Sequence, residues 1–124
     1  MQLNHANLIV ADVAATRDFF IRHFGFTVRF GGTANFVVLT DEAGFVLNLM
    51  APGKSETVAY PKNFHIGFFV ADAATVVAKQ AELGAAGHEP SPVQDFNRAG
   101  ERTRTFYCTC PGGFMVEVAH SEAA

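Results

Sequence analysis

The feature that most constrains this sequence is an internal repeat, in which two segments carry similar residues in the same order. His5-Ala-Asn-Leu-Ile-Val-Ala-Asp12 aligns with His65-Ile-Gly-Phe-Phe-Val-Ala-Asp72. Farther along the chain, Gly44-Phe-Val-Leu-Asn48-Leu aligns with Gly113-Phe-Met-Val-Glu117-Val. A repeat of this kind sets the architecture and so ranks above shorter motifs. The sequence therefore predicts two similar modules, residues 1–60 and 61–124, within one structural domain.

The spacing of apolar residues predicts the order β-α-β-β-β in each module, and hence an α+β fold. Asp12 and Asp72 are typical N-caps of the two helices, and Gly25 and Gly84 are typical stops. The expected elements of the first module are strands at 3–10, 26–30, 35–40 and 45–50 with a helix at 13–24. Those of the second are strands at 64–70, 102–109 and 114–120, a helix at 73–83 and a short strand at 88–93. Residues 51–63 are predicted to be a linker and residues 94–101 a polar loop.

Charge and hydrophobicity argue against two classes of partner. The net charge is −3 and Lys and Arg are scattered, whereas binding to nucleic acid phosphates needs clustered cations. No apolar run approaches the ~20 residues that cross a bilayer. The start of the chain lacks the pattern of a secretory signal. Cys108 and Cys110 are predicted to be free thiols on a strand, which suits a reducing compartment, so we expect a cytoplasmic protein.

Strand alternation gives three polar residues a special position. Each predicted strand presents one uniformly apolar face, and His5, His65 and Glu117 fall on the other, mixed face. A single histidine near a strand start is usually a hydrogen-bonded structural residue. Here both histidines occupy one repeat position and the carboxylate occupies the other repeated site. Two imidazoles and a carboxylate are a recurring ligand set for a divalent metal with open coordination positions, so the sequence predicts such a site.

The same residues carry a resemblance to the vicinal oxygen chelate superfamily, which includes glyoxalase I, extradiol dioxygenases, fosfomycin-resistance thiol transferases and bleomycin-resistance proteins. The resemblance covers essentially the whole chain. Its carriers are Leu3-Asn-His5-Ala-Asn-Leu-Ile-Val with Asp12, Asp18-Phe-Phe with Phe24-Gly25-Phe26, Phe64-His65-Ile-Gly-Phe, and Pro111-Gly-Gly-Phe-Met-Val-Glu117. It implies paired βαβββ modules whose curved mixed sheets form a metal-containing cavity.

By this resemblance the four metal positions of the family fall on His5, Asn48, His65 and Glu117. Glyoxalase I usually has a ligand where Asn48 stands, and an amide oxygen is a weaker ligand than a carboxylate. The set His5, His65 and Glu117 is more similar to that of the dioxygenases and the fosfomycin-modifying enzymes. The implied cofactor is a divalent metal ion: Fe, Mn, Ni or Zn.

Two functions follow as alternatives. The first is a metal-dependent enzyme, a dioxygenase, lyase or thiol transferase, that acts on a small molecule through metal-chelated oxygens. In it Tyr107 and Arg104 are candidates for proton transfer or substrate anchoring, with Asn48 and Arg102 as further substrate contacts. The second is a bleomycin-resistance type of protein that sequesters an antibiotic or another aromatic compound. The chain has thirteen Phe and no Trp, and some of these Phe could line an apolar pocket. The candidate lining residues are Phe36, Met50, Phe69, Phe96 and Phe106.

The resemblance also implies a homodimer, because modules of this superfamily often pair across chains. In that arrangement His5 of one chain shares the metal with ligands of the other. The sequence leaves open whether the cavity forms within one chain or between two.

Overall fold

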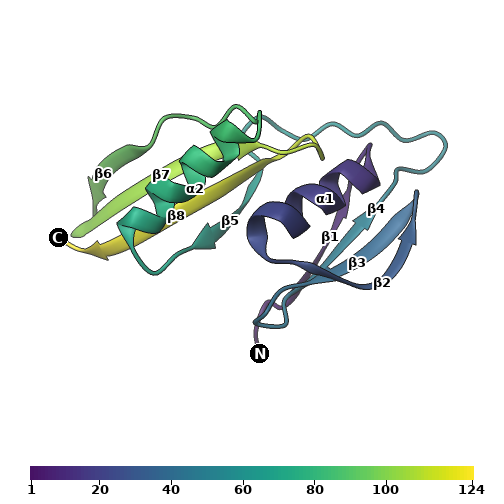
Figure 1. The fold of residues 1–124 in the computed structure, drawn as a ribbon, viewed down its shortest axis with the longest axis horizontal. Coiled ribbons are helices and arrows are strands. Elements are labelled where there is room, and N and C mark those ends of the chain that lie inside the picture. Colours follow the sequence, from purple (N-terminus) through teal and green to yellow (C-terminus); the bar gives the residue numbers. More distant parts are fainter. The chain divides into compact units, whose positions relative to one another are not determined.

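The computed structural model describes residues 1–124 and contains two four-stranded sheets, each accompanied by one helix (Figure 1). The chain divides into two units. One is Met1–Tyr60 with the turn Pro111–Gly113, and the other is Pro61–Cys110 with Phe114–Ala124. The α+β class and the βαβββ order predicted for each half are confirmed.

In the first unit the sheet has the strand order β1-β4-β3-β2, in which β1 runs parallel to β4 and the other pairs are antiparallel. Helix α1 packs against β3 and β4. The elements are β1 (His5–Ile9), α1 (Val13–Phe24), β2 (Thr27–Thr33), β3 (Phe36–Thr40) and β4 (Val46–Met50).

The second unit repeats this topology with the order β5-β8-β7-β6, where β5 is parallel to β8. Helix α2 lies across β7 and β8, as Figure 1 shows in green. The elements are β5 (His65–Phe69), α2 (Ala73–Ala85), β6 (Gln94–Arg98), β7 (Glu101–Thr109) and β8 (Met115–Ala123).

The repeat seen in the sequence is reproduced in strand register. In the first sheet His5 pairs with Val46 and Asn7 with Asn48. In the second sheet His65 pairs with Met115 and Gly67 with Glu117. The residues that align in the two repeated segments thus also occupy equivalent positions in the two sheets. Asn48 and Glu117 are therefore structural equivalents, and so are His5 and His65.

Both helices begin and pack as their sequences dictate. The carboxylate of Asp12 accepts a hydrogen bond from the Ala15 amide at 2.9 Å, and that of Asp72 accepts one from the Thr75 amide at 2.7 Å. Each helix covers the apolar face of its own sheet. Burying one large apolar side chain stabilises the fold by roughly 1.5–3 kcal/mol. The largest fully buried side chains are Phe20, Leu39, Leu47 and Leu49 in the first unit and Leu83, Phe106 and Phe114 in the second.

The sequence prediction was wrong at two places in the second module. Helix α2 continues through Gly84 to Ala85, and the left-handed backbone that ends it is at Gly87, with φ 89°. Residues 88–93 form no strand, while part of the predicted polar loop is strand β6. Every residue of β6 is exposed, so the strand has no apolar alternation to reveal it. Its backbone pairing with β7 forms it, through a tight turn at Ala99 and Gly100.

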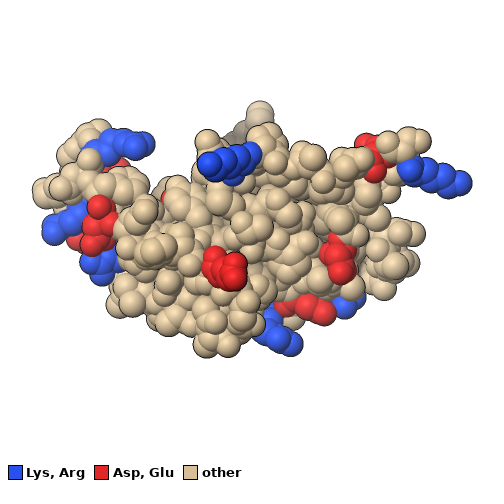
Figure 2. Space-filling model, turned by 90° about the horizontal axis from the view of Figure 1, so that it is seen from above, with Lys and Arg blue, Asp and Glu red and all other residues tan.

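Three further observations bear on the sequence expectations. Neither helix is long and apolar enough to span a membrane. On the face shown in Figure 2, Lys and Arg side chains occur singly or in small groups rather than as a continuous patch. Cys108 and Cys110 are both free and buried, and burial raises the pKa of the Cys108 thiol.

Replacing the N-cap of α1 by alanine should destabilise the protein. The substitution Asp12→Ala removes the acceptor for the Ala15 amide and should lower the free energy of unfolding by about 1 kcal/mol. Urea denaturation followed by circular dichroism measures this. Asp18→Ala is the matched control, because Asp18 lies inside the same helix, is exposed, and pairs only with its partly exposed neighbour Arg17. Equal losses in the two variants would show that the cap is not the cause.

Candidate metal centre

The parallel pairing of β5 with β8 brings His65 and Glu117 together on one face of the second sheet. The two side chains project from neighbouring strands, two positions apart in register. His65 Nε2 lies 3.6 Å from Glu117 Oε1, and the side chains are 38% and 19% exposed. The pair is therefore reachable from solvent without being fully hydrated. Protonation of His65 would make it an ion pair.

The other polar atoms of the two side chains have hydrogen-bond partners. His65 Nδ1 lies 2.9 Å from the carbonyl oxygen of Asn63. A carbonyl only accepts, so Nδ1 carries the proton and the neutral ring presents the lone pair of Nε2. On the other side, the Thr105 hydroxyl donates to Glu117 Oε2 at 2.7 Å. Outer hydrogen bonds of this kind are what orient metal-ligating histidines and carboxylates.

Tyr107 belongs to the same face. It pairs with Glu117 across β7 and β8, and its ring meets the His65 ring edge to face at a centroid distance of 5.3 Å. Burial raises the pKa of the Tyr107 phenol, and its hydrogen bond with Glu117 and the charge of that carboxylate raise it further. The phenol is therefore protonated at neutral pH and is a proton donor beside the pair.

Two hollows of about 260 and 380 Å³ meet at His65. The first is also lined by Gly67, Phe68, Phe69, Glu117 and Ala119, and the second by Asn63, Tyr107 and Met115. Phe69 is 86% exposed, which is unusual for so large an apolar side chain. At Gly67 a Cβ atom would lie 3.4 Å from the Cβ of Glu117, so the glycine keeps this side of the carboxylate open. The face thus combines two ligand-type groups with apolar surface.

The equivalent face of the first unit is less polar. His5 stands where His65 stands, and its Nδ1 lies 3.4 Å from Asn4 Oδ1. Asn48 replaces Glu117, and Val38 replaces Tyr107. Phe36 and Met50 pair on this face and are partly exposed. Neither unit by itself brings together three His, Cys, Asp or Glu side chains that could hold a metal ion.

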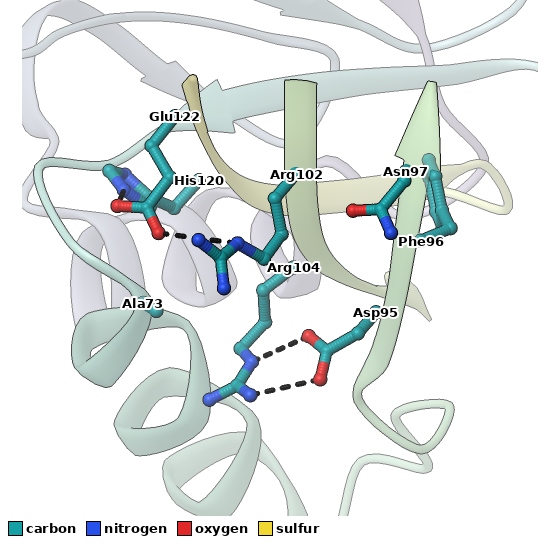
Figure 3. A pocket seen from close by; sticks show the side chains of 8 residues that line it. All are labelled: Ala73, Asp95, Phe96, Asn97, Arg102, Arg104, His120 and Glu122. Atoms are coloured by element: carbon teal, nitrogen blue, oxygen red, sulfur yellow. Dashed lines mark hydrogen bonds and ion pairs between the residues drawn. The ribbon is translucent and has the colours of Figure 1, made fainter. Parts of the chain in front are cut away.

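Arg102 and Arg104 lie on the other, helix-covered face of the second sheet, because they are an odd number of residues from Tyr107 on the regular strand β7. There they line a hollow of about 300 Å³ with Asp95, Asn97, His120 and Glu122 (Figure 3). Arg104 Nε and Nη2 donate to the two oxygens of Asp95 at 2.7 and 2.9 Å. This pairing lowers the pKa of Asp95. Arg102 Nε lies 3.6 Å from Glu122 Oε1. Both arginines are therefore balanced by carboxylates of neighbouring strands.

The two remaining phenylalanines predicted to line a pocket have different positions. Phe106 is fully buried in the core of the second unit and offers no surface to a ligand. Phe96 pairs with Thr103 across β6 and β7, at a position on the face of Tyr107, and it also lines the hollow of Figure 3. It is 38% exposed, and the guanidinium carbon of Arg98 lies 5.6 Å from its ring centroid.

Thr105 and Gly67, which contact Glu117, were not recognised from the sequence. No motif in the sequence singles out either residue, and their contact with Glu117 depends on strand pairing. The alignment of repeats contained one usable signal. The alignment of the closing strands makes Phe36 of the first module the counterpart of Thr105. A hydroxyl therefore occurs at this position only in the module that has the carboxylate.

Comparison with known proteins agrees with this architecture. The family model of the Glyoxalase/Bleomycin resistance protein/Dioxygenase superfamily matches residues 2–118. The chain belongs to this superfamily. Curated proteins give no significant match.

Solved structures show the same fold over nearly the whole chain. The structure of a possible glyoxalase from Bacillus cereus is 37% identical, with a TM-score of 0.81 over 95% of this chain and 97% of that one. A lactoylglutathione lyase from Agrobacterium tumefaciens is 18% identical, with a TM-score of 0.76 and coverage of 96% and 92%. A glyoxalase/bleomycin resistance protein/dioxygenase from Nocardioides is 18% identical, with a TM-score of 0.74 and coverage of 97% and 83%.

His120, in the hollow of Figure 3, should make stability depend on pH. Its Nδ1 lies 3.0 Å from the Val70 carbonyl and its Nε2 3.5 Å from Glu122 Oε2. The hydrogen bond to Val70, and secondarily Glu122, raise the pKa of His120 in the folded state. The resulting stabilisation is fully present below the unfolded-state pKa of about 6.5 and is lost as pH rises through the folded-state value.

Proton NMR titration of the histidine ring signals measures the His120 midpoint directly. Glu122→Gln should lower that midpoint without restoring the ordinary value, because the Val70 carbonyl remains. In denaturation experiments the advantage of the wild type over His120→Gln should shrink from acidic to mildly alkaline pH. An advantage that grows with pH would contradict the raised pKa.

Proposed function

We propose that this protein is a divalent-metal-dependent enzyme that acts on a small molecule through two adjacent oxygens. The observation that carries the proposal is the contact between His65 and Glu117. His65 Nε2 and Glu117 Oε1 lie 3.6 Å apart, while His65 Nδ1 contacts the Asn63 carbonyl and Glu117 Oε2 accepts a hydrogen bond from Thr105. This separation suits two ligands of one ion with bonds of about 2.0–2.2 Å.

The residues present fit a metal ion in their chemistry. A neutral imidazole and a carboxylate suit Fe, Mn, Ni or Zn. We propose His5, the repeat counterpart of His65, as the third ligand. When bound, the ion would polarise substrate oxygens as a Lewis acid and stabilise developing negative charge on them. Asn48 stands at the fourth position, where an amide oxygen would be a weaker ligand than a carboxylate, and this favours dioxygenase or thiol transferase chemistry over that of glyoxalase I.

Other residues on this face are candidates for proton transfer and for substrate binding. The Tyr107 phenol, protonated and beside His65, can donate a proton to a substrate oxygen as charge develops there. Phe69 offers a nearly fully exposed ring on the same face as the pair, and rings of this kind bind apolar or aromatic substrates. We therefore expect a substrate with vicinal oxygens attached to an apolar or aromatic body. Phe36, Met50 and Phe96 are further candidates for contacts with it.

The exposed Phe69 ring also supports a second candidate function, the binding of an aromatic compound without chemistry. In that case the contact between His65 and Glu117 supports the pocket without holding a metal ion. The two functions differ in metal dependence. The test is to purify this protein without chelator and measure its metal content. If it holds no divalent ion and gains none on exposure to Fe(II), Mn(II), Ni(II) or Zn(II), the binding function is supported over the enzyme function.

Removing either proposed ligand should abolish tight metal binding. We expect wild-type protein to bind one Mn(II) or Zn(II) per chain in isothermal titration, and His65→Ala and Glu117→Gln to lose this binding. Each variant loses one of a small number of strong donors. His120→Gln is the matched control, since it removes a histidine from the opposite face of the same sheet. Unchanged binding in His65→Ala and Glu117→Gln would exclude the site.

We also propose that the protein is a homodimer located in the cytoplasm. The superfamily resemblance and the exposed apolar side chains support a dimer. Sedimentation equilibrium distinguishes the 13.4 kDa chain from a dimer of twice that mass.

A further inference from the structure

Thr105 is a polar residue in an apolar setting. It lies on β7, is completely buried, and is one of three buried polar or charged residues in the chain, with Thr16 and His23. Its Oγ1 lies 2.7 Å from Glu117 Oε2 and 3.2 Å from the Val118 carbonyl oxygen. The hydroxyl is therefore enclosed with two acceptors, one of which is the candidate ligand.

The hydroxyl has a single proton to share between these acceptors. The shorter contact is with the carboxylate, and a hydrogen bond to a charged acceptor is roughly twice as strong as one between neutral groups. Donation to Glu117 therefore prevails while Glu117 is ionised. It turns Oε2 inward toward β7 and leaves Oε1 facing His65 Nε2.

This contact also reduces the freedom of a long side chain. Immobilising a glutamate side chain carries a cost in rotamer entropy. An anchored Oε2 means that most of this cost is met when the protein folds, before any ligand arrives. Glycine at position 67 has no side chain to restrain the carboxylate on that flank, where a Cβ atom would lie 3.4 Å from the Cβ of Glu117. Thr105 is thus the buried group that anchors Oε2, in addition to the hydrogen bond between Glu117 and Tyr107.

The first unit provides an internal comparison. There the position of Thr105 is taken by Phe36, and the position of Glu117 by Asn48. The unit without the carboxylate also lacks the hydroxyl that would orient it. A purely structural role in the β-sheet would be equally useful in both units, and the first sheet forms the same topology without it.

We infer that Thr105 is a positioning residue for Glu117, which restricts that carboxylate to ligation through Oε1. The inference rests on the proposed metal function. By this inference the Thr105 hydroxyl orients a metal-binding side chain, although Thr105 itself does not bind the metal ion.

The test compares Thr105→Val, which keeps the side-chain shape and removes the hydroxyl, with Thr105→Ser, which keeps the hydroxyl. Mn(II) affinity is measured by titration for each variant, and metal-free stability by urea denaturation. We expect Thr105→Val to bind Mn(II) about 10–100-fold more weakly than wild type, and Thr105→Ser to keep most of the affinity. If Thr105→Val does not fold, Thr105→Ala is compared with Thr105→Ser, because these two differ by the hydroxyl alone.

The outcomes separate this inference from the proposed function. Wild-type affinity in the hydroxyl-free variant would overturn the role of Thr105 and leave the metal function intact. Absence of Mn(II) binding in the wild type would overturn the metal function. The position of Glu117 in metal-free crystal structures then decides about Thr105. A carboxylate that turns away from His65 only when the hydroxyl is missing supports the inference, and an unchanged carboxylate overturns it.

Discussion

The parallel pairing of β5 with β8 is the contact on which the candidate site depends. These strands are separated in the chain by α2 and two other strands, yet they are neighbours in the sheet. Their register sets His65 and Glu117 two positions apart on one face, close enough for their donor atoms to lie 3.6 Å apart. A shift by one residue would turn Glu117 toward the buried face. Packing of α2 against β7 and β8 opposes such a shift, because it buries Phe106 and Val116 on that face.

The two units show how one topology can carry unequal chemistry. Their strands pair in equivalent registers, so differences at the candidate site come from side chains rather than from backbone arrangement. The first unit has Asn48, Val38 and Phe36 where the second has Glu117, Tyr107 and Thr105. The carboxylate, its hydroxyl partner and the phenol therefore occur together or not at all. This co-occurrence distinguishes the second unit from the first.

Much of the fold was predictable, and the errors have a common cause. The helices, caps and most strands follow from local apolar spacing, because this spacing shows which side of each element is buried. Strand β6 escaped prediction because its residues are all exposed, so only its backbone bonds to β7 define it. Gly84 is a typical helix stop in the sequence, but glycine tolerates a helical conformation, and α2 ends where Gly87 adopts positive φ. In both cases the deciding interaction lies outside the local pattern.

The repeat and the positions of His65 and Glu117 on the mixed faces of their strands were determined by the sequence alone. The repeat follows from residue identities, and the faces follow from alternation along single strands, which needs no knowledge of neighbours. Tertiary structure decided which other residues join them. The β7–β8 register sets Tyr107 and Thr105 beside Glu117 and sends Arg102 and Arg104 to the opposite face. The physical reason is that side chains have a period of two along a strand, so a long-range pairing between strands decides which neighbours a residue can touch.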